Sequence, residues 1–339
     1  MKIKRIHNNE IENNLQDKVE GLIFGQAIGD ALGLGTEFLN KSEIAACYPN
    51  GFTDYSQIIQ DKHRSRWEAG SWTDDTDQFL CICGSIIQSK KLDELAFAQE
   101  LYKWFKGSPM GIGKTVYKVV TVPQFVLYPH KASEIIWNLS KKQNASNGAI
   151  MRTSILGTFD FWDDEKVIQN TEKIAKVTHW DNRCVGSCVM VTLLIANILN
   201  ENKFLNVNEL IAIGNKYDTN IEPYITSSLS PKIESLNLDE PNAIGYTLKS
   251  MSAGIWAYIH ANDFEDGLLK VVNEGGDADT NACVAGSILG AKFGYDAIPK
   301  KYIDGLKNKE VLERYFDDYI AVLMKCFYDY KKSQNIRLN

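Results

Sequence analysis

Apolar residues recur at the spacing of an α-helix along almost the whole 339-residue chain. Six segments repeat apolar positions at i, i+3 and i+4, which is the pattern of a helix that buries one face. These segments are residues 19–33, 77–88, 95–105, 184–199, 243–259 and 311–330. No stretch alternates apolar and polar residues convincingly enough to indicate a β-strand. The pattern therefore predicts an all-α protein.

The predicted helices follow one another without a linker rich in Pro, Gly or Ser. We therefore expect one domain over residues 1–339, a compact bundle in which several helices are buried on most sides. Small residues in 253–258 and 282–294 would allow helix backbones to approach each other closely in that core. Residues 217–242 form the longest segment without clear periodicity, and such a segment is either a lid over a site or a plain surface loop.

Hydrophobic residues make up 44% of the chain and charged residues 24%, which is the composition of a globular protein. The formal net charge of −6 argues against a general nucleic-acid or anionic-membrane surface and favours a small or protein-bound substrate. No apolar segment follows the basic N-terminus, and we find no run of about 18 apolar residues. We therefore expect a cytoplasmic protein that does not contact a membrane.

The seven cysteines are an odd number and form no CxxC pair. Most of them lie inside apolar runs, as Cys81 and Cys83 do in one predicted helix and Cys184 and Cys188 in another. This placement favours reduced core residues over a zinc site or disulfides.

Thr and Asp residues crowd together in two motifs that lie far apart in the chain, "WTDDT" and "GGDADT". The oxygen-bearing side chains of the two motifs are Thr73, Asp74, Asp75, Asp277, Asp279 and Thr280. A single motif of this kind is usually a helix N-cap, because its oxygens accept hydrogen bonds from the first free N–H groups. A cap uses one side chain, however, and the repulsion between so many carboxylates requires an offset that a divalent cation supplies.

The second motif does not fit a calcium-binding EF-hand. Ala282 stands where the sharp turn of that loop needs Gly, and Ile288 stands where it needs a bidentate Glu. The remaining hard oxygen donors suit one or two Mg²⁺ or Mn²⁺ ions and offer no soft ligand for zinc. We expect two ions, with Asp279 or Asp74 bridging them.

Four further features carry candidate chemistry. The segment 108–115, "SPMGIGKT", lacks the first Gly and the preceding strand of a P-loop, so it does not indicate an NTPase. The segment 146–152, "SNGAIMR", precedes an apolar helical run and is either an ordinary cap or a phosphate site built from exposed N–H groups. Glu37 follows a flexible Gly-rich stretch and is either a general base or a surface residue. His179 lies between two predicted helices and is either structural or a ligand contact.

Taken together and in chain order, these segments resemble the ADP-ribosylglycohydrolase family. The matching segments are "GLIFGQAIGDALGLGTEF", "WTDDTDQ", "GIGKT", "SNGAIMR", "THWDNRCVGSCVMV" and residues 245–294. They cover about residues 19–310, nearly the whole chain. The resemblance implies an all-α fold of more than ten helices with a binuclear magnesium or manganese centre in a cleft. The metal ligands that it implies are Thr73, Asp74, Asp75, Asp277, Asp279 and Thr280.

The resemblance also implies roles for the other candidate residues. It makes Glu37, Asp74 and Asp75 the candidate catalytic carboxylates, with Glu37 near the metals and the scissile bond, and leaves open which of them is the base. The substrate-binding residues that it implies are Gly113, Ser146, Asn147, Gly148, His179 and Tyr246. The loop of Ser146, Asn147 and Gly148 would surround the diphosphate and distal ribose. Trp72, where many members have Tyr, and Ser146, where many have Gly, are mild departures from the family pattern.

The implied function is metal-dependent hydrolysis of the glycosidic bond that links ADP-ribose to an acceptor. The acceptor expected is a protein side chain, with arginine slightly favoured. Two alternatives stay open: hydrolysis of a free ADP-ribose derivative, and a protein that binds ADP-ribose or serves a structural role without catalysis. We expect a monomer with two Mg²⁺ or Mn²⁺ ions, whose partner is an ADP-ribosylated protein or an ADP-ribose derivative.

Overall fold

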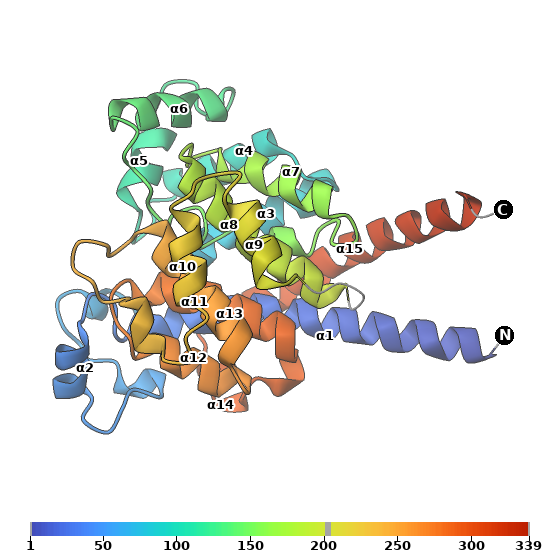
Figure 1. Cartoon of the computed structure of the whole chain (residues 1–339). Helices are drawn as coiled ribbons and strands as arrows, with labels where there is room; N and C mark the ends of the chain where they lie inside the picture. The colour runs from blue at the N-terminus through green and yellow to red at the C-terminus, as the bar shows by residue number, and fades with distance from the viewer. Residues whose placement is uncertain (1, 201–204, 338–339) are drawn as a thin grey trace.

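The computed structural model describes residues 2–200 and 205–337, and over these residues it contains fifteen α-helices and no β-strand (Figure 1). The all-α prediction is therefore confirmed. The α-helices are α1 (Lys2–Gly33), α2 (Lys41–Cys47), α3 (Asp74–Ser89), α4 (Glu94–Lys106), α5 (Lys114–Val120), α6 (Pro129–Leu139), α7 (Asp164–Ala175), α8 (Asn182–Leu199), α9 (Val207–Gly214), α10 (Ile221–Ser227), α11 (Thr247–His260), α12 (Phe264–Val272), α13 (Ala278–Phe293), α14 (Lys300–Gly305) and α15 (Lys309–Arg337). Short 3₁₀ helices are η1 (Tyr55–Gln57), η2 (Arg64–Arg66), η3 (Ser154–Gly157), η4 (Ile233–Leu236) and η5 (Tyr295–Ala297).

All six segments with helical periodicity are helices in the structure. They lie in α1, α3, α4, α8, α11 and α15, although residues 243–246 precede α11. The expectation of a long loop over 217–242 was wrong, because α10 and η4 lie within it. Their apolar residues, Ile221 and Ile225 in α10 and Ile233 and Leu236 in η4, are buried. Helices of one or two turns are too short for their periodicity to stand out in a sequence.

The C-terminal part of α1 packs along α13, and this pair has the most extensive packing among the described helices. Glycines at intervals of four residues line this face of α1, and in reverse order they meet small residues of α13. The pairs are Gly21 with Gly290, Gly25 with Gly286, Gly29 with Ala282 and Gly33 with Ala278. A methyl group on any of these four glycines of α1 would overlap a backbone carbonyl of α13. This antiparallel glycine seam sets the C-terminal end of α1 beside the N-terminal end of α13.

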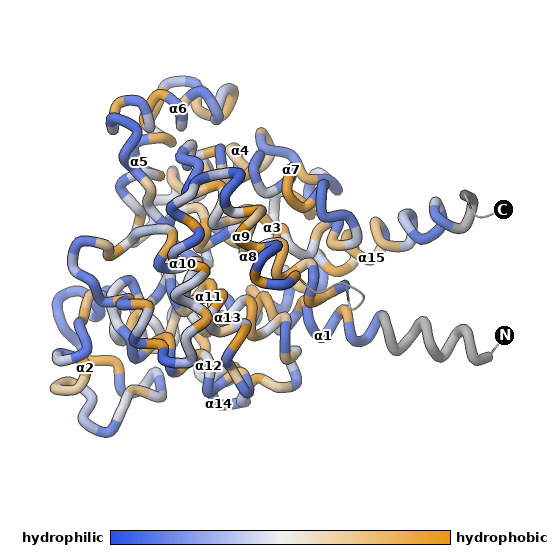
Figure 2. Tube along the Cα trace, viewed as in Figure 1, coloured by the Kyte–Doolittle hydropathy of each residue, from blue (hydrophilic) through white to orange (hydrophobic). Residues whose placement is uncertain are grey.

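Helix α8 lies in the interior, and it corrects one expectation from the sequence. It is the one described helix that is long and apolar enough to cross a membrane, although the sequence pattern indicated none. Of its 18 residues, 83% are buried inside the fold. Figure 2 shows apolar residues concentrated in α8, α11 and α13, while many outer segments are polar. Helix α8 therefore has the burial of a core helix.

The cysteines are unpaired, as expected from their positions. Five are buried: Cys81, Cys83, Cys184, Cys188 and Cys283. Cys47 is exposed and Cys326 is partly exposed, so these two are not core residues.

Candidate metal and substrate site

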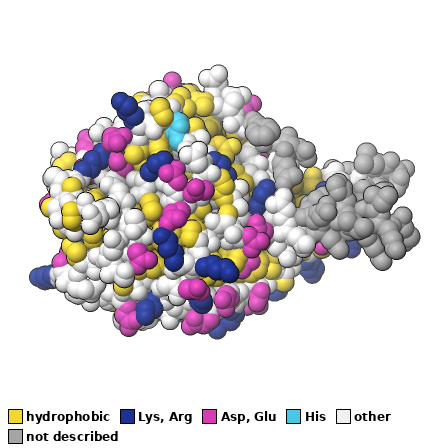
Figure 3. Space-filling model, turned by 90° about the horizontal axis from the view of Figure 1, so that it is seen from below, with side chains coloured by type: hydrophobic (Ala, Val, Ile, Leu, Met, Phe, Trp, Pro, Cys, Tyr) yellow, Lys and Arg dark blue, Asp and Glu magenta, His cyan; other side chains and the backbone are white. Residues whose placement is uncertain are grey.

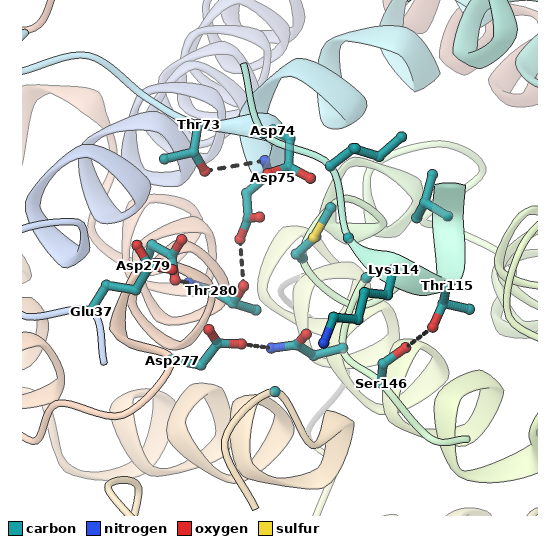
Figure 4. A pocket seen from close by; sticks show the side chains of 18 of the residues that line it. Glu37, Thr73, Asp74, Asp75, Lys114, Thr115, Ser146, Asp277, Asp279 and Thr280 are labelled. Atoms are coloured by element: carbon teal, nitrogen blue, oxygen red, sulfur yellow. Dashed lines mark hydrogen bonds between the residues drawn. The ribbon is translucent and has the colours of Figure 1, made fainter. Parts of the chain in front are cut away.

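A cavity of about 530 Å³ opens where several loops and helix ends meet (Figure 4). The segment after α1, the start of α3 and the start of α13 form one side of it. The rest is formed by residues 63, 66–67, 111–116, 144, 146–148, 151, 179 and 244–245. Segments from nearly the whole chain therefore contribute to one site.

The start of α13 and the segment after α1 form the acidic end of this cavity. One carboxylate oxygen from each of Glu37, Asp277 and Asp279 lies within 4.8 Å of the others. Asp277 is the N-cap residue of α13, and Asp279 lies in its first turn. Glu37 belongs to the turn that follows α1, so the α1–α13 seam is what brings it to the two aspartates.

The start of α3 joins this acidic end through a hydrogen bond between the two Thr/Asp motifs. The Thr280 hydroxyl donates to Asp75 Oδ2 at 2.7 Å, although the two residues lie 205 positions apart. Thr73 is the N-cap of α3, and its Oγ1 accepts a hydrogen bond from the backbone N–H of Asp75. Asp74 lies in the first turn of α3 and also lines the cavity. The six predicted metal ligands therefore all line one cavity.

Asp30, which the sequence analysis missed, holds the start of α3 in place. Its carboxylate lies inside α1 and accepts hydrogen bonds from the backbone N–H groups of Thr73 and Thr76, each at 3.0 Å, and from the Thr76 hydroxyl at 2.6 Å. Burial raises the pKa of Asp30 to about 7. An Asp inside an otherwise apolar helical segment was the signal available in the sequence, because burying a carboxylate is costly without such partners.

The aspartates of the acidic end repel one another. Burial, followed by the charges of neighbouring carboxylates, raises the pKa of Asp74 and of Asp277 to about 6. The same causes raise the pKa of Asp75 and of Asp279 well above the usual value. Within the described residues, none of these four carboxylates has an ion pair with Lys or Arg. A cluster of hard oxygen donors with uncompensated negative charge fits Mg²⁺ or Mn²⁺.

His63 orients Glu37, and the sequence analysis gave no signal for it. His63 Nε2 lies 2.6 Å from Glu37 Oε2, and Arg66 Nη2 lies 2.6 Å from His63 Nδ1. A guanidinium can only donate, so Nδ1 accepts and Nε2 carries the hydrogen that it donates to Glu37. Arg64 fixes the same turn by donating from Nε to the carbonyl oxygens of Leu34 and Gly35, both at 3.0 Å.

The other end of the cavity carries mainly neutral hydrogen-bonding groups. Ser146 Oγ lies 3.0 Å from His179 Nε2 and 2.8 Å from Thr115 Oγ1. Burial, with a smaller contribution from the charge of Arg152, lowers the pKa of His179 well below its usual value, which favours the neutral imidazole. Figure 4 shows Lys114 reaching toward the same space from the start of α5. This end therefore offers hydroxyl, imidazole and ammonium groups in place of carboxylates.

The segment 146–152 does not open an α-helix, so that part of the expectation was wrong. It runs through turns to η3, and the backbone N–H of Asn147 is occupied by a 3.0 Å hydrogen bond to the carbonyl of Gly245. The side chain of Asn147 instead donates to Asp277 at 2.5 Å and so connects the two ends of the cavity. At Gly148 a methyl group would come within 3.0 Å of the His179 ring, which explains why the smallest residue stands there.

Two predicted contacts lie differently from the expectation. Gly113 lines the cavity, but its backbone group bonds to Asp74. Tyr246 is not among the residues that line the cavity, and its ring packs on Tyr224 at 5.7 Å and beneath Arg183 at 5.9 Å. No residue of 217–242 lines the cavity either, so in this structure the segment does not lie over the cavity as a lid would.

Comparison with known proteins agrees with this architecture. The chain is 25% identical over 308 residues to ADP-ribosylarginine hydrolase Tri1 of Serratia proteamaculans, covering 88% of this chain and 78% of that protein. It is 25% identical over 315 residues to ADP-ribosyl-[dinitrogen reductase] glycohydrolase of Rhodospirillum rubrum, covering 91% and 97%. A solved structure described as an ADP-ribosylglycohydrolase-related protein complex has the same fold, with a TM-score of 0.69, 22% identity, and coverage of 92% of this chain and 99% of that chain.

The model of the family named ADP-ribosylglycohydrolase matches residues 11–329, which include both Thr/Asp motifs and every residue named for the cavity. The resemblance inferred from the motifs is therefore confirmed, and the chain belongs to the ADP-ribosylglycohydrolase family.

Proposed function

We propose that this protein hydrolyses the glycosidic bond between ADP-ribose and an acceptor. The observation that supports this most directly is the contrast between the two ends of one cavity. Aspartates without a Lys or Arg partner among the described residues gather with Glu37 at one end, and neutral donors with Lys114 gather at the other. Metal-bound ribose hydroxyls suit the first end, and the oxygens of a diphosphate suit the second.

The metal ions in this proposal are two Mg²⁺ or Mn²⁺ ions. The residues that would hold them are Thr73, Asp74, Asp75, Asp277, Asp279 and Thr280. Such ions orient hydroxyl groups and lower the pKa of a bound water. The volume of about 530 Å³ lies within the usual range for a small-molecule site, about 300–1,000 Å³.

Glu37 is the general base in this proposal. Among the three candidate carboxylates it is the one oriented by a histidine, because His63 donates to its Oε2. Asp75 instead accepts from Thr280, and Asp74 accepts from Gln78. Glu37 would take the proton of the attacking water, while the neighbouring aspartates stabilise positive charge on the ribose in the transition state.

The acceptor proposed is the side chain of an ADP-ribosylated protein, with arginine favoured. Support for arginine comes from the similar protein named ADP-ribosylarginine hydrolase. A partly exposed cavity mouth, with Phe38 and Met110 exposed near it, is compatible with a substrate that remains attached to a protein. We also propose a cytoplasmic location, on the sequence pattern alone.

The test is release of ADP-ribose from proteins modified on arginine, serine and other side chains, with Mg²⁺, Mn²⁺ or EDTA. We expect metal-dependent release from one class of acceptor. Asp279→Ala should abolish release and metal binding together, whereas Asp318→Ala, an exposed carboxylate on α15, should leave both unchanged. Release by Asp279→Ala at the wild-type rate without metal would contradict the mechanism. ADP-ribose binding without release from any acceptor or free derivative would indicate a non-catalytic binding protein.

A further inference from the structure

Arg152 is fully buried behind the cavity, and within the described residues no carboxylate pairs with it. Its guanidinium donates from Nη1 to Gln78 Oε1 at 2.5 Å and from Nη2 to Thr178 Oγ1, and it lies 5.1 Å from the centre of the Phe97 ring. No acceptor among the described residues is within reach of its Nε. Burying a charge without a counter-ion is costly. The hydrogen bonds of Arg152 to Gln78 and Thr178 are therefore the interactions that must offset this cost.

The first partner connects Arg152 to the acidic end. A guanidinium has five donors and no acceptor, so the oxygen of the Gln78 amide must face it. The amide nitrogen of Gln78 therefore faces the other way, and it donates to Asp74 Oδ2 at 3.0 Å. Arg152 thus determines which way Gln78 points, and Gln78 holds Asp74 as a hydrogen-bond acceptor.

The second partner connects Arg152 to the neutral end. Thr178 Oγ1 accepts from Arg152, and it lies 2.8 Å from His179 Nδ1, the one described acceptor in reach of its single hydroxyl hydrogen. His179 Nδ1 therefore accepts, and Nε2 carries the ring hydrogen. Nε2 faces Ser146 Oγ at 3.0 Å, so the histidine donates to the serine.

The chain of hydrogen bonds ends at two hydroxyl groups in the cavity. Thr115 Oγ1 accepts from Asn144 Nδ2 at 2.7 Å, and Ser146 Oγ accepts from His179. The single hydrogen bond between the two hydroxyls, at 2.8 Å, uses one of their two hydrogens. The other hydrogen has no acceptor among the described residues, so it is available to a ligand.

We propose that Arg152 is a positioning residue that sets the direction of hydrogen bonding at both ends of the cavity before substrate binds. Through Gln78 it keeps Asp74 an acceptor at the metal end. Through Thr178 and His179 it leaves one hydroxyl hydrogen of the Ser146–Thr115 pair available. That hydrogen can be donated to a ligand group that only accepts hydrogen bonds. This inference rests on the proposed function, in which that group is the diphosphate of ADP-ribose. Donors that are oriented in advance need no reorganisation when the anion arrives.

The decisive measurement is the tautomer of His179 in the ligand-free protein, read from the ¹⁵N shifts of its two ring nitrogens. The chain has five histidines, so His179→Gln identifies the signals. We expect wild-type His179 to be neutral at pH 7 with the hydrogen on Nε2. Thr178→Val removes the hydroxyl and should give a mixture of tautomers and about tenfold weaker binding of ADP-ribose. Thr178→Ser keeps the hydroxyl and should restore both properties.

Arg152→Met tests whether both hydrogen-bonded branches, the one through Gln78 and the one through Thr178, depend on Arg152. It should perturb the His179 tautomer and also weaken Mn²⁺ binding, whereas Gln78→Met should weaken Mn²⁺ binding alone. If Arg152→Met does not fold, the Thr178 pair and Gln78→Met still test each branch.

A wild-type His179 with its hydrogen on Nδ1, or a Thr178→Val variant with an unchanged tautomer, would overturn the inference. Failure of the proposed function is distinguishable, because the tautomer is measured without substrate. Wild-type protein that neither binds nor releases ADP-ribose, but keeps the Nε2–H tautomer, would remove the function and the diphosphate assignment while leaving the positioning role of Arg152 intact.

Discussion

At the residue scale, buried polar side chains outside the motifs orient the residues inside them. Asp30 holds the start of α3, and His63 holds Glu37. Arg64 fixes the turn that carries Glu37. Each acts through hydrogen bonds to a distant part of the chain, so its partner cannot be read from the local sequence.

We expect His63→Ala to lower the rate of ADP-ribose release by about 10–100-fold, the usual effect of removing a residue that orients a functional group. His63→Gln should retain more activity because its amide can still donate to Glu37. The measurement is kcat with saturating substrate and metal, beside the free energy of unfolding from urea titration. An unchanged kcat in His63→Ala would show that Glu37 needs no orientation by His63.

Glu20 provides a test of pH dependence away from the cavity. Burial, followed by repulsion from Asp17, Asp317, Asp296 and Glu313, raises its pKa from 4.5 to about 7. The folded state therefore holds this proton more tightly than the unfolded state, so its contribution to stability is complete below pH 4.5 and is lost as pH rises through about 7.

The glutamine in Glu20→Gln cannot ionise, so the variant should not lose stability as the pH rises through about 7. We expect the variant to match wild type in its free energy of unfolding near pH 4.5 and to exceed it by about 1 kcal/mol at pH 8.5, allowing for solvent screening of this half-buried group. Urea titrations of both proteins at the two pH values measure the difference. The same difference at both pH values would rule out ionisation of Glu20 as its cause.

At the element scale, the glycine seam between α1 and α13 positions the acidic end of the cavity. Close backbone approach brings the turn after α1, with Glu37, to the start of α13, with Asp277 and Asp279. The sequence contains both halves of this seam as small residues at intervals of four. Their pairing across 245 to 269 residues is a property of the folded chain.

We expect Gly25→Ala to lower the free energy of unfolding by about 1–3 kcal/mol, because the added methyl would overlap the carbonyl of Gly286 and force the helices apart. Gly84→Ala in α3 is the matched control. There the nearest atoms would lie 3.6 Å from the methyl, so we expect a gain of about 0.5–1 kcal/mol from helix propensity. Equal and small effects at both positions would contradict the tight seam.

At the scale of the whole molecule, metal binding should stabilise the fold. The acidic end joins α1, α3 and α13, and an ion that bound only the folded state would stabilise it by about 2.7 kcal/mol at 100 times its dissociation constant. The raised pKa of Asp279 reflects burial first and repulsion from Glu37, Asp277 and Asp75 next, which a divalent cation would relieve.

We therefore expect Mn²⁺ or Mg²⁺ to raise the melting temperature of wild-type protein and EDTA to reverse the shift. Asp279→Asn keeps the shape of the side chain but loses its charge, so it should lose most of the shift. In EDTA at pH 8 the same variant should be at least as stable as wild type, because one source of repulsion is gone. Thermal melts with and without metal measure both effects, and an equal metal shift in the variant would contradict the proposed ligand.

The surface gives few further indications about partners. Figure 3 shows one face on which Lys and Arg side chains alternate with Asp and Glu, without an extended area of one sign. The proposal about the substrate therefore depends on the cavity, where the charges are separated.

The sequence alone predicts the all-α class and the positions of the longer helices, because helical periodicity is a local property of successive residues. It also determined the family and the Thr/Asp motifs, since these are contiguous. The tertiary structure was needed to show that Glu37, Asp277 and Asp279 share one site, that 217–242 contains a helix, and that Tyr246 does not line the cavity. The roles of Asp30, His63 and Arg152 depended on it too, because a hydrogen bond between distant residues forms only when packing brings its two ends together.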